Sequence, residues 1–422
     1  MGRRGGQSEI IIGVDIGSTA IRVAVGQVTY SGAGQQPNLQ VIGAVEVPSE
    51  GVHKGVVSSI DEVVSSLTHA LEQTERLTGL PIEHAWVGVS GAQAISQKNR
   101  GVVAVAKPDG EISGEDVDRV VDAARTIAPP LNYEILHVLP SGFHVDGQTN
   151  IKDPAGMSGV RLEVEAQIIY INSSHIKNIT KAVYRTGIDI DDIVLSILSS
   201  ASVVATPRQK DLGVAVVNIG GATTSLVVYE GGEVIHTATI PIGSEHVTND
   251  LAIGLRTSID IAELVKLEYG KSNSKNISKK EKIDLSRFDK NLETEEVQLF
   301  YIAQIIEARM GEIMEKIDEE FFKAHVSRLL PAGVIFTGGG AKIDGLTDLA
   351  KDELGLPATI GYPIHMDSIS DKSSDISFTT AIGLLSWAFD LQSSKIVSKR
   401  SRFVSSNTAI KKVQNIWKSL IP

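Results

Sequence analysis

Two glycine-rich turns that repeat one pattern limit the fold of this chain more than any other feature of its sequence. The first, Asp15-Ile-Gly-Ser-Thr, follows an apolar run at 10–14, and the second, Asn218-Ile-Gly-Gly-Ala, follows an apolar run at 213–217. Alternating apolar residues return after each turn, which is typical of a strand, a turn and a second strand. A repeat of this kind, about 200 residues apart, predicts two similar lobes.

The chemistry of these turns suits the binding of phosphate. Glycine lets backbone N–H groups approach an anion closely, Ser18 and Thr19 can add hydroxyl donors, and Asp15 is free to hold a hydrated Mg²⁺. A third such turn, Gly338-Gly-Gly-Ala-Lys, follows the buried run at 334–337 and suits a phosphate or an adenosine lying against backbone. One turn alone is usually structural. Three, two of which repeat one another, indicate a nucleotide site.

Residues 84–165 between the two repeats have the pattern of a small α/β domain inserted into a larger one. Strands are expected there at 85–90, 102–106, 133–145 and 161–171, with a helix from about 113 to 127. Elsewhere the pattern predicts a strand at 193–198, helices at 60–77, 174–186, 245–268, 295–322 and 379–389, and a solvated loop at 270–282.

Charge is divided unevenly along the chain. The net charge of −11, from 40 Lys and Arg against 51 Asp and Glu, argues against general nucleic-acid binding. Residues 393–422 carry seven basic residues and no acidic one, which leaves −18 for residues 1–392. Such a division predicts that the two parts meet different partners. The absence of Cys excludes disulfides and Cys-based zinc sites.

The basic end has the pattern of an amphipathic helix at 406–422, after a Ser/Lys/Arg linker at 393–405. Its apolar arc and the lysines beside it, all candidates for membrane contact, are Ile410, Lys411, Lys412, Val413, Ile416, Trp417, Lys418, Leu420 and Ile421. An apolar face with Trp and flanking lysines is typical of a helix lying in an anionic membrane interface. The alternative is a terminal helix packed on the body. No apolar run approaches the roughly 20 residues that span a bilayer.

The order of the motifs resembles the actin/Hsp70/sugar-kinase ATPase superfamily, with two phosphate motifs and a late adenosine motif. Within it, the chain resembles the FtsA family of actin-like bacterial cell-division proteins. The matching stretches are 12–19, 151–163, 241–252, 262–266, 306–309, 333–345 and 380–385, of which 151–163 and 241–252 are the most specific. The resemblance implies an α/β, actin-like two-lobed ATPase fold with a small inserted α/β subdomain and a C-terminal amphipathic helix.

The same resemblance implies a division of the chain into domains. The first lobe core is expected at 8–83 and 166–195, the inserted protein-interaction subdomain at 84–165, the second lobe core at 196–228 and 306–392, and the outer subdomain of the second lobe at 229–305. The linker and the membrane-targeting helix follow these.

Carried over position by position, the resemblance implies one site for ATP and Mg²⁺. Its nucleotide-binding residues would be Asp15, Gly17, Ser18 and Thr19 in the first phosphate loop, Asn218, Gly220, Gly221, Ala222, Thr223 and Gly243 around the second, Glu263 and Lys266 at the ribose and base, and Gly338, Gly339, Gly340 and Lys342 at the adenosine. Asp15 would hold the metal through water. Without the family, Glu263 and Lys266 would be interpreted as a surface ion pair.

The second phosphate motif departs from the family pattern at three positions. Asn218 stands where Asp is usual, Ala222 where a third Gly is typical, and Ser225 where an acidic residue is common. Asn keeps a hydrogen-bonding oxygen, but it cannot supply negative charge to a metal or act as a base. ATP binding is therefore expected to survive and hydrolysis to be slow or absent.

The resemblance implies a protein that polymerises on the cytoplasmic face of the membrane at the division site and tethers the tubulin-like protein FtsZ. The FtsZ tail would dock on 229–305, and other division proteins on the inserted subdomain. A second hypothesis is the type IV pilus actin-like protein, which shares the architecture, binds a membrane-protein peptide and needs no amphipathic tail. A third is a small-molecule kinase of the same superfamily, for which Asn218 removes one candidate catalytic carboxylate.

Overall fold

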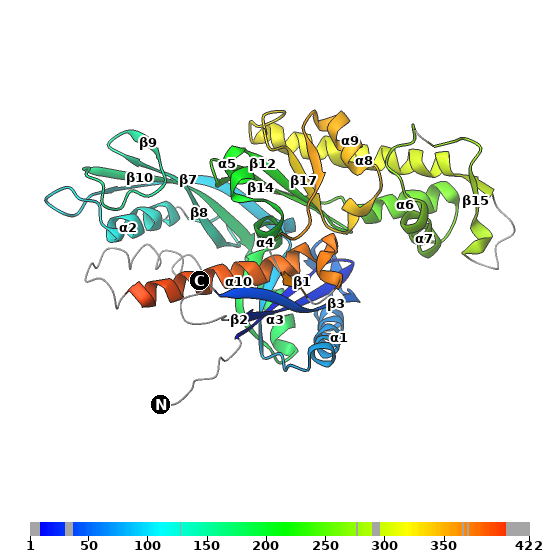
Figure 1. Cartoon of the computed structure of the whole chain (residues 1–422), viewed down its shortest axis with the longest axis horizontal. Helices are drawn as coiled ribbons and strands as arrows, with labels where there is room; N and C mark the ends of the chain where they lie inside the picture. The colour runs from blue at the N-terminus through cyan, green and yellow to red at the C-terminus, as the bar shows by residue number, and fades with distance from the viewer. Residues whose placement is uncertain are drawn as a thin grey trace.

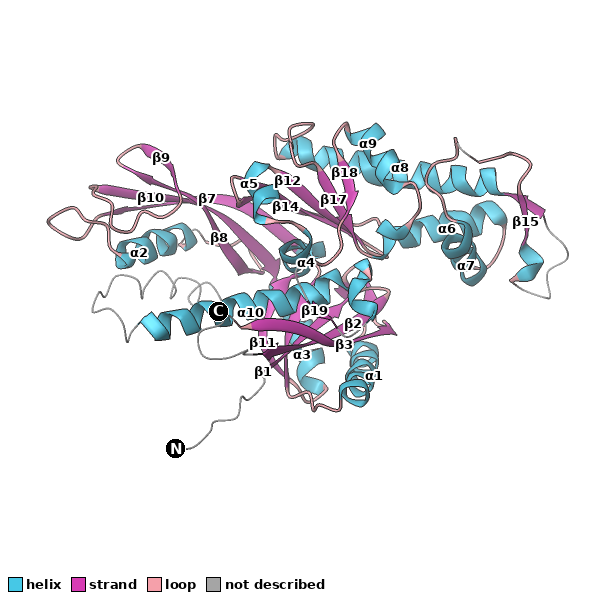
Figure 2. Ribbon diagram, in the orientation of Figure 1, coloured by secondary structure: helices cyan, strands magenta, loops and turns pink. Residues whose placement is uncertain are grey.

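A computed structural model of the chain describes residues 9–29, 37–126, 128–275, 277–288, 296–364, 367–368 and 371–401. Figures 1 and 2 show two lobes lying against each other and two smaller subdomains that project in opposite directions. The predicted two-lobed α/β fold with an inserted subdomain is confirmed. The amphipathic helix predicted at 406–422, with the membrane candidates from Ile410 to Ile421, lies outside the described residues.

A mixed sheet forms the core of the first lobe. Its spatial order is β11 (Asp189–Leu195), β6 (His84–Val89), β1 (Glu9–Ile16), β2 (Ala20–Thr29), β3 (Asn38–Pro48) and β19 (Asp367–Ser368). The β1–β2 hairpin pairs Ile16 with Ile21, which leaves the first glycine-rich turn at its tip. Helices α1 (Ile60–Thr78) and α3 (Ser173–Arg185) cover one face, and α10 (Thr379–Ser401) lies on the other beside α4 (Ser196–Val204) (Figure 2). The short strands β4 (Val52–His53) and β5 (Val56–Val57) precede α1.

The second lobe repeats this plan around a sheet of order β14 (Glu233–Ile240), β13 (Thr224–Glu230), β12 (Val214–Ile219), β17 (Val334–Thr337) and β18 (Ala358–Ile360). Strand periodicity sends alternate residues of β12 to opposite faces. Val214 and Val216 join the core shared with α4 and α10, whereas Ala215 and Val217 join the core under α8 (Leu299–Lys323) and α9 (Leu346–Leu354). The short α5 (Pro207–Leu212) leads into β12.

The inserted subdomain is a sheet of order β7 (Ala94–Ala104), β10 (Arg161–Asn172), β8 (Tyr133–Val145) and β9 (Gln148–Ile151), covered by α2 (Gly114–Arg125). Ser113 and Asp116 form the capping box of α2 that their spacing predicts. The predicted boundary at 84 is too early, because β6 pairs in parallel with β1 and belongs to the first lobe. The boundary at 229 is early for the same reason, since β14 pairs with β13 in the second-lobe sheet.

The outer subdomain contains α6 (Ser244–Leu255), α7 (Ile259–Tyr269), the strands β15 (Lys282–Asp284) and β16 (Glu296–Gln298), and the start of α8. The single helix predicted at 245–268 is wrong. The backbone of Arg256 is left-handed, with φ of 52°, and Ser258 caps a second helix. The helix predicted from 295 begins at Leu299 instead, because Glu296–Gln298 pairs with Lys282–Asp284.

Three further predicted boundaries differ in the structure. The strand expected at 102–106 begins at Ala94 and ends at Ala104. The strand expected at 193–198 ends at Leu195, where α4 begins. Helix α10 continues to Ser401, through most of the range 393–405 predicted as a linker, because that stretch contains no Gly or Pro to end it. Among the described residues, no helix combines the length and the apolar character needed to cross a membrane.

Candidate nucleotide-binding site

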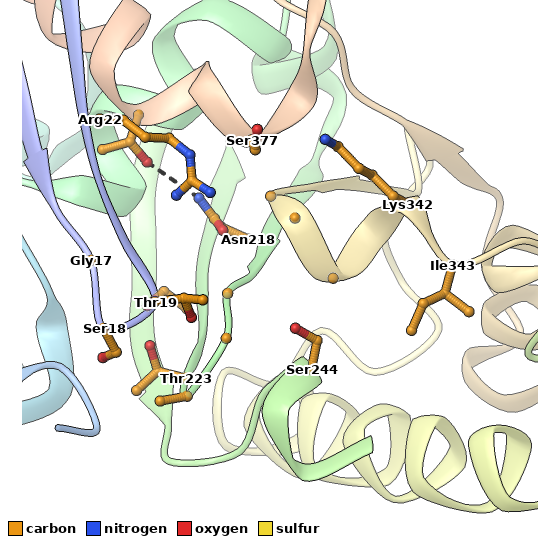
Figure 3. Close-up of a pocket in the computed structure, with 18 of the residues that line it drawn as sticks. Gly17, Ser18, Thr19, Arg22, Asn218, Thr223, Ser244, Lys342, Ile343 and Ser377 are labelled. Carbon is orange, nitrogen blue, oxygen red and sulfur yellow. Dashed lines mark hydrogen bonds between the residues drawn. The ribbon is translucent and has the colours of Figure 1, made fainter. Parts of the chain in front are cut away.

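A cavity of about 640 Å³ lies where the two phosphate hairpins, α7 and the third glycine-rich turn meet. Cavities of this size accommodate cofactor-sized ligands. The predicted residues that line it are Asp15, Gly17, Ser18, Thr19, Asn218, Gly220, Gly221, Ala222, Thr223, Glu263, Lys266, Gly338, Gly339, Gly340 and Lys342. Figure 3 shows residues of the first hairpin facing those of the second lobe across this space. Motifs separated by more than 300 residues are thus brought around one cavity.

The first hairpin is a tight turn whose hydroxyl groups are held by neighbours. Gly17 N–H donates to Ala20 O at 3.1 Å and closes the turn. Ser18 Oγ accepts a hydrogen bond from Gly55 N at 2.8 Å, which ties the turn to the β4–β5 connection. Backbone N–H groups and hydroxyls gathered at such a turn are suitable donors for phosphate oxygens.

Asp15, at the end of β1, is a partly buried residue of the cavity wall. Ser196 Oγ donates to Asp15 Oδ1 at 3.4 Å. Burial raises the pKa of Asp15 to about 6, against the opposing effects of the Arg22 charge and the Ser196 hydrogen bond. Arg22 is itself engaged by Glu46 at 2.6 Å. A cation at Asp15 would favour the ionised carboxylate and displace the proton.

The start of α6 is hydrogen-bonded to the backbone of the second hairpin. Gly220 N–H donates to Thr223 O at 2.9 Å, while Ser244 N–H donates to Gly220 O at the same distance. Gly243, a predicted site residue, packs beneath this hairpin, where a Cβ would overlap the carbonyl oxygens of Gly220 and Gly221. Its role is therefore to allow close backbone approach and not to line the cavity.

Asn218 lies between helices of the shared core. With the amide orientation assigned from the hydrogen-bond network, its Nδ2 donates to Ser200 Oγ at 3.2 Å and to Thr380 Oγ1 at 3.4 Å. Gly338, with φ of 86°, lies directly against this side chain, and a Cβ there would overlap Asn218 Oδ1. The position supplies a neutral amide at the cavity wall (Figure 3).

Glu263 and Lys266 differ in burial and in their contacts. The ion pair expected without the family is present, with Lys266 Nζ 2.6 Å from Glu263 Oε2, but the lysine is buried. Lys266 Nζ also donates to Thr248 Oγ1 at 2.8 Å and to Ser244 O at 3.4 Å. The ammonium therefore binds α6 to α7. Glu263 also accepts a hydrogen bond from Thr248 Oγ1 at 2.5 Å, and its side chain is 41% exposed against 8% for Lys266.

The third turn presents backbone more than side chains. Lys342 pairs with Asp375 at 2.6 Å, and Gly340 packs against Ile219. Residues other than the predicted site residues also line the cavity, among them Arg22, Glu46, Ser196, Ser244, Tyr269, Ser377 and Thr380. Ser244 adjoins Gly243 and could have been found from the motif. Thr380 begins the matching stretch 380–385 and could have been found in the same way, whereas Arg22 comes from a strand with no local signal of a site.

Two family models match the chain. "Cell division protein FtsA" matches residues 215–383, and "SHS2 domain inserted in FTSA" matches residues 91–170. The second match agrees with a subdomain that begins after β6. Cell division protein FtsA of Pseudomonas aeruginosa is 34% identical over 385 residues, covering 91% of this chain and 90% of that protein.

The chain belongs to the FtsA family of cell-division proteins. Cell division protein FtsA of Bacillus subtilis is 36% identical over 96% of this chain and 89% of its own length, and that of Escherichia coli K12 is 31% identical over 89% and 90%. The family resemblance inferred from the motifs is confirmed, and with it a cell-division function.

Solved structures establish the actin-like ATPase fold. The PilM-PilN type IV pilus biogenesis complex matches with a TM-score of 0.64 at 17% identity, over 90% of this chain and 98% of that one. MreB5 of Spiroplasma citri bound to ADP matches with a TM-score of 0.54 at 13% identity, over 92% and 98%. At these identities the similarity concerns the fold alone.

Proposed function

We propose that this FtsA-family protein binds ATP, polymerises on the cytoplasmic face of the membrane and tethers FtsZ to it at the division site. The observation that carries the proposal is the cavity in which both phosphate hairpins and the third glycine-rich turn meet in a member of this family. ATP would act as a ligand that orders the two lobes for assembly, since binding between them stabilises their joined arrangement.

The donors around Asp15 fit Mg²⁺. A carboxylate with the hydroxyls of Ser18 and Thr19 nearby offers only oxygen ligands, which this metal prefers. The metal would neutralise phosphate charge, and Asp15 would hold it through water. With the neutral Asn218 at the second hairpin, hydrolysis is expected to be slow or absent.

The FtsZ tail is assigned to the outer subdomain. There, Ile253 of α6 is 77% exposed and Tyr301 of α8 is 44% exposed. The two helices touch at this point, since Tyr301 OH donates to Gly254 O at 3.5 Å. Exposed apolar side chains on adjacent helices suit a peptide that buries its own apolar side chains between them. Other division proteins are assigned to the inserted subdomain, where Leu131 is 88% exposed.

The membrane contact is assigned to residues 406–422, whose lysines would meet anionic lipid headgroups. The test is flotation of anionic phospholipid vesicles with purified FtsZ, ATP and either the full chain or a chain ending at residue 405. FtsZ should float with the full chain only. FtsZ that floats equally well with the truncated chain would sink the tether proposal.

The sequence leaves one alternative function, that of the type IV pilus actin-like protein, in which the protein binds a peptide of a membrane protein. That function needs no amphipathic tail. Binding to vesicles that contain no membrane protein distinguishes the two functions. A full chain that does not bind these vesicles, but does bind the cytoplasmic peptide of a transmembrane protein, would favour the alternative.

A further inference from the structure

Glu245 makes a contact that phosphate binding alone does not require. It is the second residue of α6, and its N–H donates to Gly221 O at 2.8 Å, which fixes its backbone to the second hairpin. Its side chain reaches the other lobe, where Oε1 accepts a hydrogen bond from Thr19 Oγ1 at 2.7 Å. One residue therefore joins the two phosphate hairpins.

This contact lies beside the cavity, at the end where the hairpins meet. Thr19 and Gly221 both line the cavity, and a Cβ on Gly221 would overlap Thr19 Oγ1 and lie 2.7 Å from Glu245 Oε1. Figure 3 shows Thr19 lying next to the second hairpin, near Thr223. The lobes thus touch through residues that line the cavity or adjoin it.

A first-turn acidic residue often serves its own helix, because a carboxylate interacts favourably with the positive end of the helix dipole. That role needs no contact outside the helix. Glu245 instead accepts from a residue 226 positions earlier in the chain. Its side chain is therefore committed to the opposite lobe.

We propose that Glu245 lowers the affinity of the site for a nucleoside triphosphate relative to the diphosphate, a role that rests on the proposed nucleotide binding. The Thr19 hydroxyl has one hydrogen, so it can donate to Glu245 or to a terminal phosphate. The carboxylate is also a negative charge near the added phosphate and repels it. A diphosphate lacks the competing group. Glu245 is thus a specificity-determining residue. Its hydrogen bond with Thr19 is compatible with a bound diphosphate but competes with the terminal phosphate of a triphosphate.

The test compares dissociation constants of Mg-ATP and Mg-ADP by calorimetry on the full chain. Glu245→Gln removes the charge and should raise the preference for ATP over ADP about tenfold, with ADP affinity nearly unchanged. Glu245→Asp retains the charge and should keep the wild-type ratio. Glu353→Gln is the control for the loss of one negative charge. Glu353 lies on the exposed side of α9 in the same lobe and does not line the cavity, so its substitution should leave the ratio of ATP to ADP affinity unchanged.

The outcomes separate this role from nucleotide binding itself. A wild-type chain that binds neither nucleotide overturns the proposed function and this inference with it. If the wild-type chain binds ATP but Glu245→Gln leaves the ratio of ATP to ADP affinity unchanged, only the role of Glu245 is overturned. The same holds if Glu245→Gln changes both affinities by the same factor. Unfolding without nucleotide reports separately on the lost lobe contact. If Glu245→Gln does not fold, Glu245→Ala also removes the charge and should show the same rise in preference for ATP over ADP, and an unchanged ratio would again overturn the role of Glu245.

Discussion

Asn218 is the residue of the second hairpin on which the proposal of slow hydrolysis depends. Its amide donates to the hydroxyls of Ser200 and Thr380, so both sides of the shared core hold it in place. A carboxylate there could accept from the same hydroxyls after they rotate, and it would add negative charge to the metal environment. The neutral amide is therefore expected to allow ATP binding and to contribute little to ATP hydrolysis.

Substitution of Asn218 by Asp should increase single-turnover ATP hydrolysis by about 10- to 100-fold, because it restores a group able to position or polarise water. ATP affinity should change little, since the hairpin backbone is untouched. Rapid mixing with excess enzyme over labelled ATP measures the step directly.

Asn249→Asp is the matched control for this experiment, because it adds the same charge on the exposed side of α6. It should leave the rate at the wild-type value. Brisk hydrolysis by the wild-type chain would contradict the assignment of Asn218, and so would an Asn218→Asp rate equal to that of the control.

The pKa of Asp15 predicts that the gain in ATP affinity on adding Mg²⁺ depends on pH. Its pKa of about 6 means that the carboxyl is protonated below this pH and ionised above it. A water-mediated metal contact requires the ionised form. The gain in ATP affinity on adding Mg²⁺ should therefore be small at about pH 5 and increase as the pH rises through about 6.

Asp15→Asn provides the comparison for this profile, because it keeps the shape of the side chain and removes its titration. The terminal phosphate of ATP also titrates, but it does so with both proteins. The difference between the two profiles therefore belongs to Asp15. Parallel profiles would contradict a metal contact at this residue.

Glycine spacing predicted which backbone segments line the cavity, but it could not predict how Lys266 is used. The partners of Lys266 include Thr248 and Ser244, which stand on the preceding helix. Their approach depends on the break at Arg256, which the sequence pattern did not reveal. The role of Gly243 escaped prediction for a similar reason, since it depends on tertiary contact with the hairpin.

Helix α10 connects the candidate nucleotide site with both lobes, and its position depends on close packing against α4. Gly383 lies against the α4 backbone, where a Cβ would overlap Ser199 O. Ser199 Oγ donates to Thr380 O at 3.3 Å in the same contact. The two helices therefore approach at a distance that only glycine permits.

Gly383→Ala should lower the free energy of unfolding by about 1–3 kcal/mol, because the added methyl forces the helices apart. Gly311→Ala in α8 is the matched change, since a Cβ there meets nothing within 4 Å. It should raise stability by about 0.5–1 kcal/mol through helix propensity. Thermal unfolding of both variants should show shifts of opposite sign. Shifts of the same sign would mean that α4 and α10 do not require this close approach.

Element boundaries followed from the sequence where local signals were strong. Strand β8, Tyr133–Val145, has the predicted bounds, and the helix predicted at 60–77 is α1, Ile60–Thr78. The break between α6 and α7 was missed because Arg256-Thr-Ser contains neither Gly nor Pro. The early boundary of the inserted subdomain has a different cause. Only the pairing of β6 with β1, a contact distant in sequence, assigns that strand to the first lobe.

At the scale of the whole molecule, the second lobe exposes apolar side chains at two separated places. Ile259 of α7 is 60% exposed in the outer subdomain. At the opposite end of α8, Phe322 is 74% exposed and Leu329, in the segment after the helix, is 68% exposed. Figure 1 shows α8 running between these regions along the lobe. A head-to-tail polymer requires two such different surfaces, one on each end of the protomer.

We propose that the surface at Phe322 joins protomers in the filament. Phe322→Asp should then abolish filaments on lipid monolayers with ATP, because it would place a charge where apolar surface must be buried. ATP binding by the monomer should persist, since Phe322 does not line the cavity. Tyr184→Asp, at an exposed aromatic residue of α3 in the other lobe, is the control and should leave filaments intact. Membrane binding should weaken with filament loss, because a reversible tail holds best when many linked copies bind together. Filaments that form normally from the Phe322 variant would show that the protomers join through other surfaces.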